Sequence, residues 1–116
     1  PVSAPFHCPL MQPAADQMAA ALSQTAINAP FVPVFANILA APVSEPDEIR
    51  KLLVEQVTGR VRWRESAIAM RDARVSYFFE FGGKVLSPMV KRSAGDDVAT
   101  TSIISMDDIE AALKEI

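Results

Sequence analysis

The sequence predicts an α/β fold in which a mainly parallel sheet is covered by helices. Segments with strand character alternate with segments with helical character along the 116 residues, as in α/β proteins. The strand predicted at 75–81 (VSYFFEF) is apolar on both faces, which is typical of a strand that is covered on both sides. Gly82 and Gly83 then lead directly into another helical segment. A parallel sheet with helices on its faces accounts for all three observations.

The first part of the chain predicts a strand end, a helix and an irregular strand. Residues 2–5 indicate the end of a strand, and apolar residues at helical spacing predict a helix over about 10–23. That helix buries one face, formed by Met11, Ala15, Met18 and Leu22. The apolar segment 31–38 predicts the next strand. Because proline cannot donate to a ladder, Pro33 indicates that this strand lies at a sheet edge or is irregular near its start. A loop is expected over 41–45.

A second helix is predicted over about 46–58, and Gly59 ends it. The segment 44–47 (SEPD) has the spacing of a capping box just before this helix. The helix buries a stripe formed by Ile49, Leu52, Leu53 and Val57. Gln56 lies beside this stripe, near the C-terminal end of the helix.

The second half of the chain continues the alternation of helices and strands. The remaining elements are helices over about 63–73, 84–91 and 106–116, and a strand over 101–105. The succession of strand, two glycines and helix around Gly82 has the outline of a phosphate cradle. A tight turn with close packing of strand and helix explains the same pattern, so the sequence leaves both interpretations open.

Composition and charge restrict the classes of function. A chain of 116 residues forms one domain at most, and half of its residues are apolar. The net charge of −3 gives no electrostatic footprint for nucleic acid. No apolar run reaches the roughly 20 residues that cross a bilayer, so no membrane span is expected. The single cysteine, Cys8, suits a reducing, cytoplasmic setting, and no ligand-spaced set of Cys and His predicts a metal site.

The only histidine, His7, is the strongest candidate for chemistry. It lies between Pro5 and Pro9, at the junction of an extended segment and a helix, and such loops often carry functional side chains. Imidazole is the side chain best suited to moving protons near neutral pH. A lone histidine beside Phe6 and Cys8 is more often a packed core residue, however, so the chemistry by itself favours a structural role.

Four blocks of the sequence carry a resemblance to a known family. They are PVSAPFHCPLMQPAADQM at 1–18, FVPVFANI at 31–38, LVEQVTGRVRW at 53–63 and FEFGGKVLSPMVKR at 79–92. In this order they resemble the malonyl-CoA:acyl-carrier-protein transacylases, the loading enzymes of bacterial fatty-acid synthesis. The resemblance implies that residues 7–116 form the C-terminal portion of an α/β-hydrolase-like acyltransferase core. Residues 1–6 would then end a small ferredoxin-like subdomain.

The resemblance also implies roles for individual residues. His7 matches the family's catalytic base, and Gln56 matches the residue whose backbone carbonyl orients that base. Phe6 matches a position that helps to exclude a methyl group at the malonyl α-carbon: in related polyketide acyltransferases, Phe there accompanies malonyl and Ser accompanies methylmalonyl. Asn37 ends a predicted strand, where it either caps a turn or supports the catalytic residues from behind. The family's nucleophilic serine and its carboxylate-binding arginine have no counterpart in this chain, which is therefore expected to be inactive by itself.

The implied reaction passes malonyl from coenzyme A to a serine and then to the phosphopantetheine thiol of acyl carrier protein. Malonyl-CoA is a substrate, no cofactor is bound permanently, and the expected partners are acyl carrier protein and the N-terminal half of the same enzyme. Two alternatives remain: an acyltransferase domain of a polyketide synthase, and a non-catalytic fragment that binds carrier protein. Five arginines form either a solvated helix face or a surface for acidic carrier protein: Arg60, Arg62, Arg64, Arg71 and Arg74.

Overall fold

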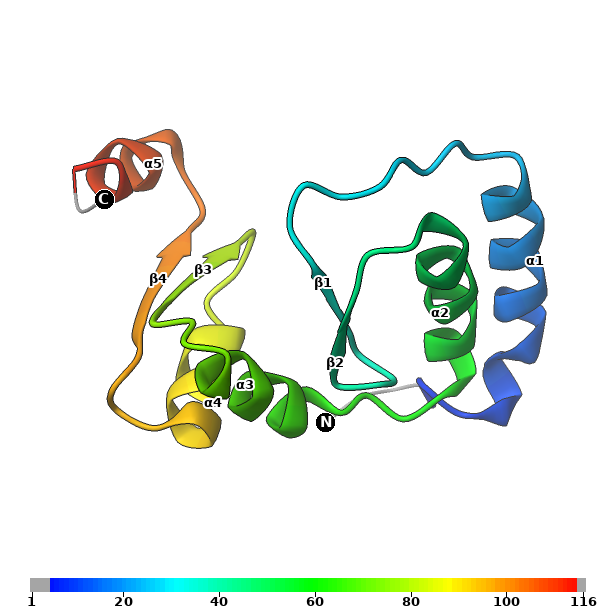
Figure 1. Ribbon diagram of the computed structural model, residues 1–116, viewed down its shortest axis with the longest axis horizontal. Coiled ribbons are helices and arrows are strands. Elements are labelled where there is room, and N and C mark those ends of the chain that lie inside the picture. Colours follow the sequence, from blue (N-terminus) through cyan, green and yellow to red (C-terminus); the bar gives the residue numbers. More distant parts are fainter. Residues whose placement is uncertain (1–4, 115–116) are drawn as a thin grey trace. The chain divides into compact units, whose positions relative to one another are not determined.

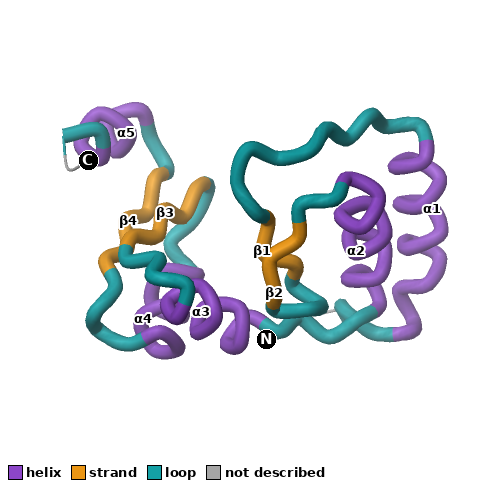
Figure 2. The backbone as a smooth tube through the Cα atoms, in the orientation of Figure 1, coloured by secondary structure: helices purple, strands orange, loops and turns teal. Residues whose placement is uncertain are grey.

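The computed structural model describes residues 5–114, and Figure 1 shows their helices and strands. The chain divides into two compact units, Pro1–Ser66 and Ala67–Ile116, which we call the N-terminal unit and the C-terminal unit. Each unit combines helices with a two-stranded sheet (Figure 2), so the predicted α/β class is confirmed. The strand end expected at 2–5 lies outside the described residues, except for Pro5, which is not in a strand. The same holds for the subdomain boundary that was drawn from this strand end.

The helices of the N-terminal unit agree with the predictions. The elements of this unit, in chain order, are η1 (Pro9–Met11, a 3-10 helix), α1 (Gln12–Ser23), β1 (Val34–Ala36), β2 (Ala41–Val43) and α2 (Pro46–Thr58). Helix α1 packs against α2, and Ala15 and Leu52 are buried as expected. Met18 and Leu53, which were also expected on the buried faces, are exposed. The Arg50 guanidinium of α2 donates to the carbonyls of Leu22 and Thr25, and so satisfies the C-terminal end of α1.

Strands β1 and β2 form a short antiparallel hairpin that was not predicted. Phe35 lies opposite Pro42, and the left-handed backbone of Ala40 (φ 55°) turns the chain between the strands. The strand predicted over 31–38 is therefore shorter than expected, and the prediction of a loop over 41–45 was wrong. Pro42 is compatible with a strand here because the hairpin has no further strand beside β2 in the described chain, and proline is tolerated at such an edge.

The start of α2 is stabilised differently from the prediction. Its N-cap residue is Glu45, whose side chain makes no capping hydrogen bond. Ser44 therefore stands one residue too early, and the predicted capping box was wrong. Pro46 at the first helical position has a backbone already suited to the helix, and Asp47 and Glu48 in the first turn interact favourably with the helix dipole.

The C-terminal unit contains the predicted parallel strands. Its elements are α3 (Trp63–Asp72, within which the boundary between the units falls), β3 (Tyr77–Phe81), α4 (Leu86–Ala94), β4 (Ala99–Ile103) and α5 (Met106–Ala112). Strands β3 and β4 pair in parallel, with Tyr77 opposite Ala99 and Phe81 opposite Ile103. Helix α4 connects the two strands and packs against both, while α5 packs against β4. The buried residues of this unit are Ala67, Val90, Ala94, Val98, Ile103 and Ala112.

The ends of these elements differ from the predictions for local reasons. Strand β3 begins later than expected because Arg74 adopts a left-handed backbone (φ 68°) and the Val75 N–H returns to the Met70 carbonyl at the end of α3. Strand β4 begins two residues before the predicted 101–105, where pairing with β3 fixes its register. Helix α4 extends until Gly95, whose positive φ of 96° ends it.

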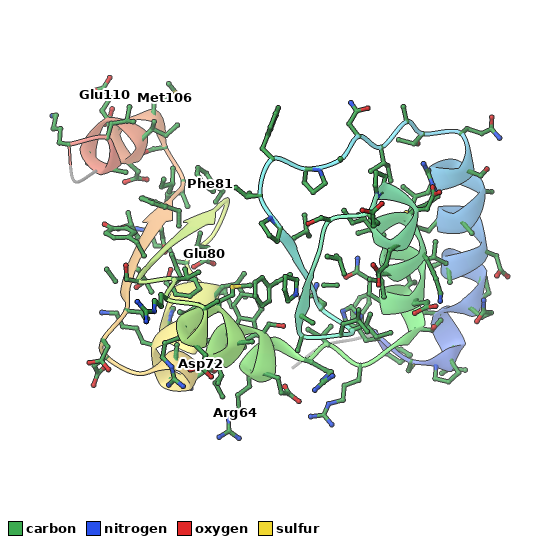
Figure 3. The ribbon with its side chains drawn as sticks, in the orientation of Figure 1. Arg64, Asp72, Glu80, Phe81, Met106 and Glu110 are labelled. Carbon is green, nitrogen blue, oxygen red and sulfur yellow. The ribbon has the colours of Figure 1, made fainter. Side chains whose placement is uncertain are left out.

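Glu80, labelled in Figure 3, lies on β3 and its carboxylate stabilises the N-terminus of α4. Its carboxylate accepts hydrogen bonds from the backbone N–H groups of Val85, Leu86 and Ser87 at 2.7–2.8 Å. It also accepts from the hydroxyls of Ser87 and Ser102. These are the donors that a bound phosphate would need, so the glycine turn serves to join strand and helix and does not form a phosphate cradle.

The same hydrogen bonds change the acidity of Glu80. Partial burial of the carboxyl group acts to raise its pKa. The donors from Leu86, Ser87 and Val85 outweigh this effect and lower the pKa of Glu80 from 4.5 to about 2. The carboxyl group is therefore ionised in the folded protein under all but strongly acidic conditions.

Apolar side chains of the C-terminal unit remain uncovered. They line a hollow formed by β3, β4 and α5, whose lining residues are Phe79, Phe81, Ile103, Ile109, Ala112 and Leu113. Phe81, labelled in Figure 3, is 72% exposed. Aromatic residues on a short strand are normally covered, so this surface is typical of a sheet that continues into further structure. Within residues 5–114, no helix has the length and apolar character needed to cross a bilayer.

Replacement of Glu80 by Gln is expected to lower the melting temperature of the protein at pH 7 by several degrees, because an amide nitrogen cannot accept the N–H groups of α4. The carboxyl is more acidic in the folded protein than in the unfolded chain, so its contribution is fully present above pH 4.5 and is lost as the pH falls through about 2. Thermal unfolding from pH 7 to pH 2 should therefore show a difference between parent and variant that closes at the acidic end. Glu110→Gln, which removes an exposed carboxylate from α5, is the matched control. A difference that stays constant over this pH range would contradict the assignment.

Candidate active site

His7 is held in a left-handed backbone conformation, with φ 53°. Few residues other than glycine adopt such a conformation, although histidine tolerates it better than most, and strained backbones of this kind cluster at functional sites. Cys8 follows in an extended conformation as the N-cap of η1, and Pro9 begins that helix. The change of direction at His7 leaves its side chain exposed in the described chain.

The His7 ring is hydrogen-bonded to the end of α2. Its Nδ1 lies 2.8 Å from the backbone carbonyl oxygen of Gln56. Gln56 belongs to the last turn of α2, where carbonyl groups have no partner further along the helix. A carbonyl oxygen can only accept, so Nδ1–H is the donor, and in the neutral ring Nε2 carries the free lone pair. This is the pairing of residues expected from the sequence.

The Gln56 side chain is held by a second hydrogen bond. Nδ2 of Asn37 donates to Oε1 of Gln56 at 3.0 Å, and both residues are half-buried. Asn37 directly follows β1, so it lies at the C-terminal end of a strand, as expected. The backbone N–H of Arg62 donates to the Asn37 carbonyl at 2.8 Å, and the Arg62 guanidinium donates to the Leu39 carbonyl at 2.9 Å. Asn37 therefore joins α2 to the turn between β1 and β2, and Arg62 anchors that turn.

Gly59 allows this turn to approach the end of α2. A Cβ atom at position 59 would lie 2.5 Å from Cδ1 of Ile38 and 2.9 Å from the Glu55 carbonyl oxygen. The Ile38 methyl group could move aside, but the Glu55 carbonyl is part of the backbone, so a side chain at position 59 would displace the end of α2. The glycine is therefore required by close packing, in addition to ending the helix as predicted.

A hollow of about 170 Å³ lies beside the Asn37–Gln56 contact. It is formed by β1, β2 and α2 and is mainly apolar, with the lining residues Val34, Phe35, Ala36, Asn37, Val43, Ile49, Leu52, Leu53 and Gln56. The two amide side chains supply the polar groups of its wall. The hydrogen-bonded side chains of Asn37 and Gln56 thus lie at the edge of an apolar surface.

The remaining candidate residues do not join this arrangement through hydrogen bonds. Phe6 precedes His7 and is 58% exposed. Cys8 is a free, half-buried thiol, and within residues 5–114 no hydroxyl or thiol is hydrogen-bonded to His7. The described residues also contain no group of His, Cys, Asp and Glu that could hold a metal ion. The site thus contains an imidazole oriented by a hydrogen bond, and no hydroxyl or thiol of the described residues 5–114 is bonded to it.

The predicted cluster of arginines is divided between the two units. Arg60 and Arg62 form ion pairs with Glu65 at 3.8 and 3.5 Å, whereas Arg71 in the C-terminal unit pairs with Asp72 at 2.8 Å. Arg64 extends away from α3 (Figure 3). These contacts favour the solvated helix face over a single basic surface.

Two contacts of the site were not predicted from the sequence: the Asn37–Gln56 bond and the anchoring of the turn by Arg62. Asparagine at a strand end was recognised as a candidate, but its partner could not be identified because the hairpin that carries it was missed. The backbone N–H of Arg62 gives no sequence signal at all.

Comparison with known proteins shows that the chain is similar to one part of longer proteins. No protein-family model matches it. It is 39% identical, over 117 aligned residues, to the malonyl CoA-acyl carrier protein transacylase of Escherichia coli strain K12, and the match covers all of this chain and 37% of the relative. The crystal structure of the acyl-carrier-protein S-malonyltransferase from Bartonella henselae matches with a TM-score of 0.90 and 46% identity, over 99% of this chain and 37% of that one.

A third relative was solved together with a partner. It is a malonyl-transacylase in complex with a type II polyketide-synthase acyl carrier protein, and it matches with a TM-score of 0.87 and 30% identity over 99% of this chain and 37% of that one. The chain therefore spans little more than a third of the length of these relatives.

Proposed function

Because sequence and fold assign this chain to the C-terminal part of the malonyl-CoA:acyl-carrier-protein transacylases, we propose that the full-length protein transfers malonyl from coenzyme A to the phosphopantetheine thiol of an acyl carrier protein. The observation that carries the proposal is the 2.8 Å hydrogen bond between Nδ1 of His7 and the Gln56 carbonyl. This bond leaves Nε2 free to accept and return a proton, which is what acyl transfer between two thiols requires of a base.

The proposed reaction has two halves that share a serine ester. In the first half, His7 takes the proton of the serine hydroxyl while the serine oxygen attacks the malonyl thioester carbonyl. The carbon–sulfur bond then breaks, and the proton passes from His7 to the coenzyme A thiolate. In the second half, His7 takes the proton of the carrier thiol, whose sulfur attacks the ester. The carbon–oxygen bond breaks and the proton returns to the serine oxygen, so the cycle closes without a permanently bound cofactor.

The nucleophile and the group that binds the malonyl carboxylate would come from outside this chain. None of its serines lies in a Gly-x-Ser-x-Gly motif, the sharp turn that presents such a nucleophile. We therefore propose that the chain by itself is inactive and that the N-terminal half of the same enzyme is its first partner. The uncovered apolar hollow on β3, β4 and α5 supports this partnership. The single cysteine suits the proposed cytoplasmic setting.

A second candidate is malonyl loading for polyketide synthesis. The relative solved with a type II polyketide-synthase carrier protein favours it, since the chemistry of loading is the same and only the acceptor differs. Transfer rates to a fatty-acid carrier protein and to a polyketide carrier protein, measured side by side, would distinguish the two. A non-catalytic fragment that only binds carrier protein would transfer malonyl to neither.

In the full-length enzyme, His7→Ala is expected to lower the rate of malonyl transfer by at least the roughly 10²–10⁴-fold that a positioned acid–base contributes. The measurement is transfer of labelled malonyl from coenzyme A to acyl carrier protein. His7→Asn is the matched control: its amide can still donate to the Gln56 carbonyl, but it has no basic nitrogen, so it should be equally slow. Transfer at the parent rate in either variant would remove His7 from the mechanism.

Phe6→Ser is expected to weaken the preference for malonyl over methylmalonyl. A bulky ring beside the base can oppose one methyl group, which corresponds to a discrimination of about 1–3 kcal/mol. The ratio of kcat/KM for malonyl-CoA and methylmalonyl-CoA should therefore fall by roughly tenfold or more in the variant. Leu10→Ala shortens another exposed apolar side chain, four residues further along, and should leave the ratio unchanged. An unchanged ratio in Phe6→Ser would exclude Phe6 as a specificity residue.

A further inference from the structure

We infer that the side-chain hydrogen bond from Asn37 to Gln56 fixes the direction of the Gln56 carbonyl, and that Asn37 is thereby a positioning residue for His7. The inference rests on the malonyl transfer proposed above, since it assigns Asn37 a part in that reaction. Asn37 makes no hydrogen bond to the His7 ring, and acts through Gln56.

The need for such a residue follows from where the acceptor lies. Carbonyl groups in the last turn of a helix have no intrahelical partner, and helix ends fray. The Gln56 carbonyl is in this position, and α2 ends two residues later at Thr58. The hydrogen bond from His7 aligns the ring with the carbonyl, but it does not hold the carbonyl itself in place. Another contact must therefore keep Gln56 fixed.

The Asn37 side chain supplies that contact from a rigid support. The Asn37 backbone carbonyl accepts the Arg62 N–H at 2.8 Å, and the Arg62 guanidinium donates to the Leu39 carbonyl two residues further along. The N–H of Ala40 bonds to the Ala36 carbonyl at 2.8 Å, which closes the turn. Asn37 thus belongs to a hydrogen-bonded turn that Arg62 anchors, whereas Gln56 lies at the end of a helix.

The close packing around Gly59 tightens the same junction. Ile38 follows Asn37, and its side chain occupies the space in which a Cβ atom at position 59 would lie. The turn therefore contacts α2 on both sides of the last helical residues, through Asn37 at Gln56 and through Ile38 at Gly59. Movement of the turn and movement of the carbonyl are coupled by this packing.

Loss of the Asn37 donor should affect the transfer rate more than substrate binding. Leucine has nearly the shape of asparagine but cannot donate, so Asn37→Leu leaves Oε1 of Gln56 without its partner. Displacement of a catalytic group by a fraction of an ångström costs less than the roughly 100-fold caused by 1 Å, so we expect kcat to fall about tenfold. The KM for malonyl-CoA should stay within about twofold, because uniform substrate binding is untouched.

The test is a double-mutant cycle in the full-length enzyme. Asn37→Leu and Gln56→Ala should each lower kcat about tenfold, and the double variant should be no slower than either, whereas independent effects would multiply to roughly 100-fold. Gln56→Glu keeps an acceptor oxygen for Nδ2 of Asn37 and should restore kcat to within about threefold of the parent. Asn28→Ala, in the exposed segment after α1, is the matched control and should have the parent rate.

A spectroscopic readout separates this inference from the proposed function. The Nδ1 proton of His7, detected by NMR in ¹⁵N-histidine-labelled protein and assigned by its absence in His7→Asn, should be visible in the parent and in Gln56→Glu. It should exchange away in Asn37→Leu and in Gln56→Ala. If Asn37→Leu does not fold, the comparison of Gln56→Ala with Gln56→Glu makes the same distinction.

The possible results distinguish the positioning role of Asn37 from the proposed function. If the parent enzyme transfers malonyl and Asn37→Leu keeps the full rate, the positioning role is overturned and the proposed function stands. A double variant that is about 100-fold slower than the parent would have the same consequence. A parent protein that transfers no malonyl would overturn the proposed function. In that event, persistence of the His7 signal in Asn37→Leu would overturn this inference, and its loss would support it.

Discussion

The free carbonyl groups at the C-terminal end of α2 are the constraint on which the N-terminal unit depends. A helix cannot satisfy these groups itself, so other parts of the chain must supply donors or leave them to solvent. Here the Glu55 carbonyl is bonded by Gly59 N–H, and the Gln56 carbonyl receives His7. The left-handed backbone of His7 and the absence of a side chain at Gly59 both serve this helix end. The candidate site thus results from the hydrogen bonds that satisfy the C-terminal end of α2.

An acceptor of this kind has a distinct chemical effect. A carbonyl group fixes which ring nitrogen carries the proton, as a carboxylate does, but it adds no net charge. The ring is oriented by a neutral group, and the surrounding hydrogen bonds from Asn37 and Arg62 are neutral or lie on the surface of the unit. The site therefore relies on geometry more than on electrostatic attraction, and small displacements of the helix end matter accordingly.

Much of the fold could be predicted from the sequence, because the long elements carry strong periodic signals. Helix α2 and the parallel β3–β4 pair followed from apolar spacing and from the doubly apolar strand. The β1–β2 hairpin was missed because Pro42 argues against a strand and three-residue strands carry little pattern. The capping box of α2 was assigned to the wrong residue, because Ser44 fits the motif but Glu45 is the N-cap. No cap was predicted for α4, because the carboxylate that stabilises it comes from a neighbouring strand, which local sequence cannot reveal.

The residues of the candidate site could likewise be predicted only in part. His7 and Gln56 could be paired only through the resemblance to a family, because 49 residues separate them and neither forms part of a local motif. Asn37 was recognised as a candidate by its place at a strand end, but its contact with Gln56 depends on tertiary packing. Contacts made by backbone atoms, such as the Arg62 N–H, leave no trace in residue identity.

The central claim is that the Gln56 main-chain carbonyl, and not a side chain, orients the catalytic base. The most direct test replaces the amide between Gln56 and Val57 by an ester in the full-length enzyme, which weakens this carbonyl as an acceptor and leaves every side chain in place. Weakening the bond by about 1 kcal/mol should lower the malonyl transfer rate about fivefold. An ester between Ile49 and Arg50, which removes an equivalent helical N–H far from His7, should leave the rate nearly unchanged. Equal rates for the two esters would contradict the account.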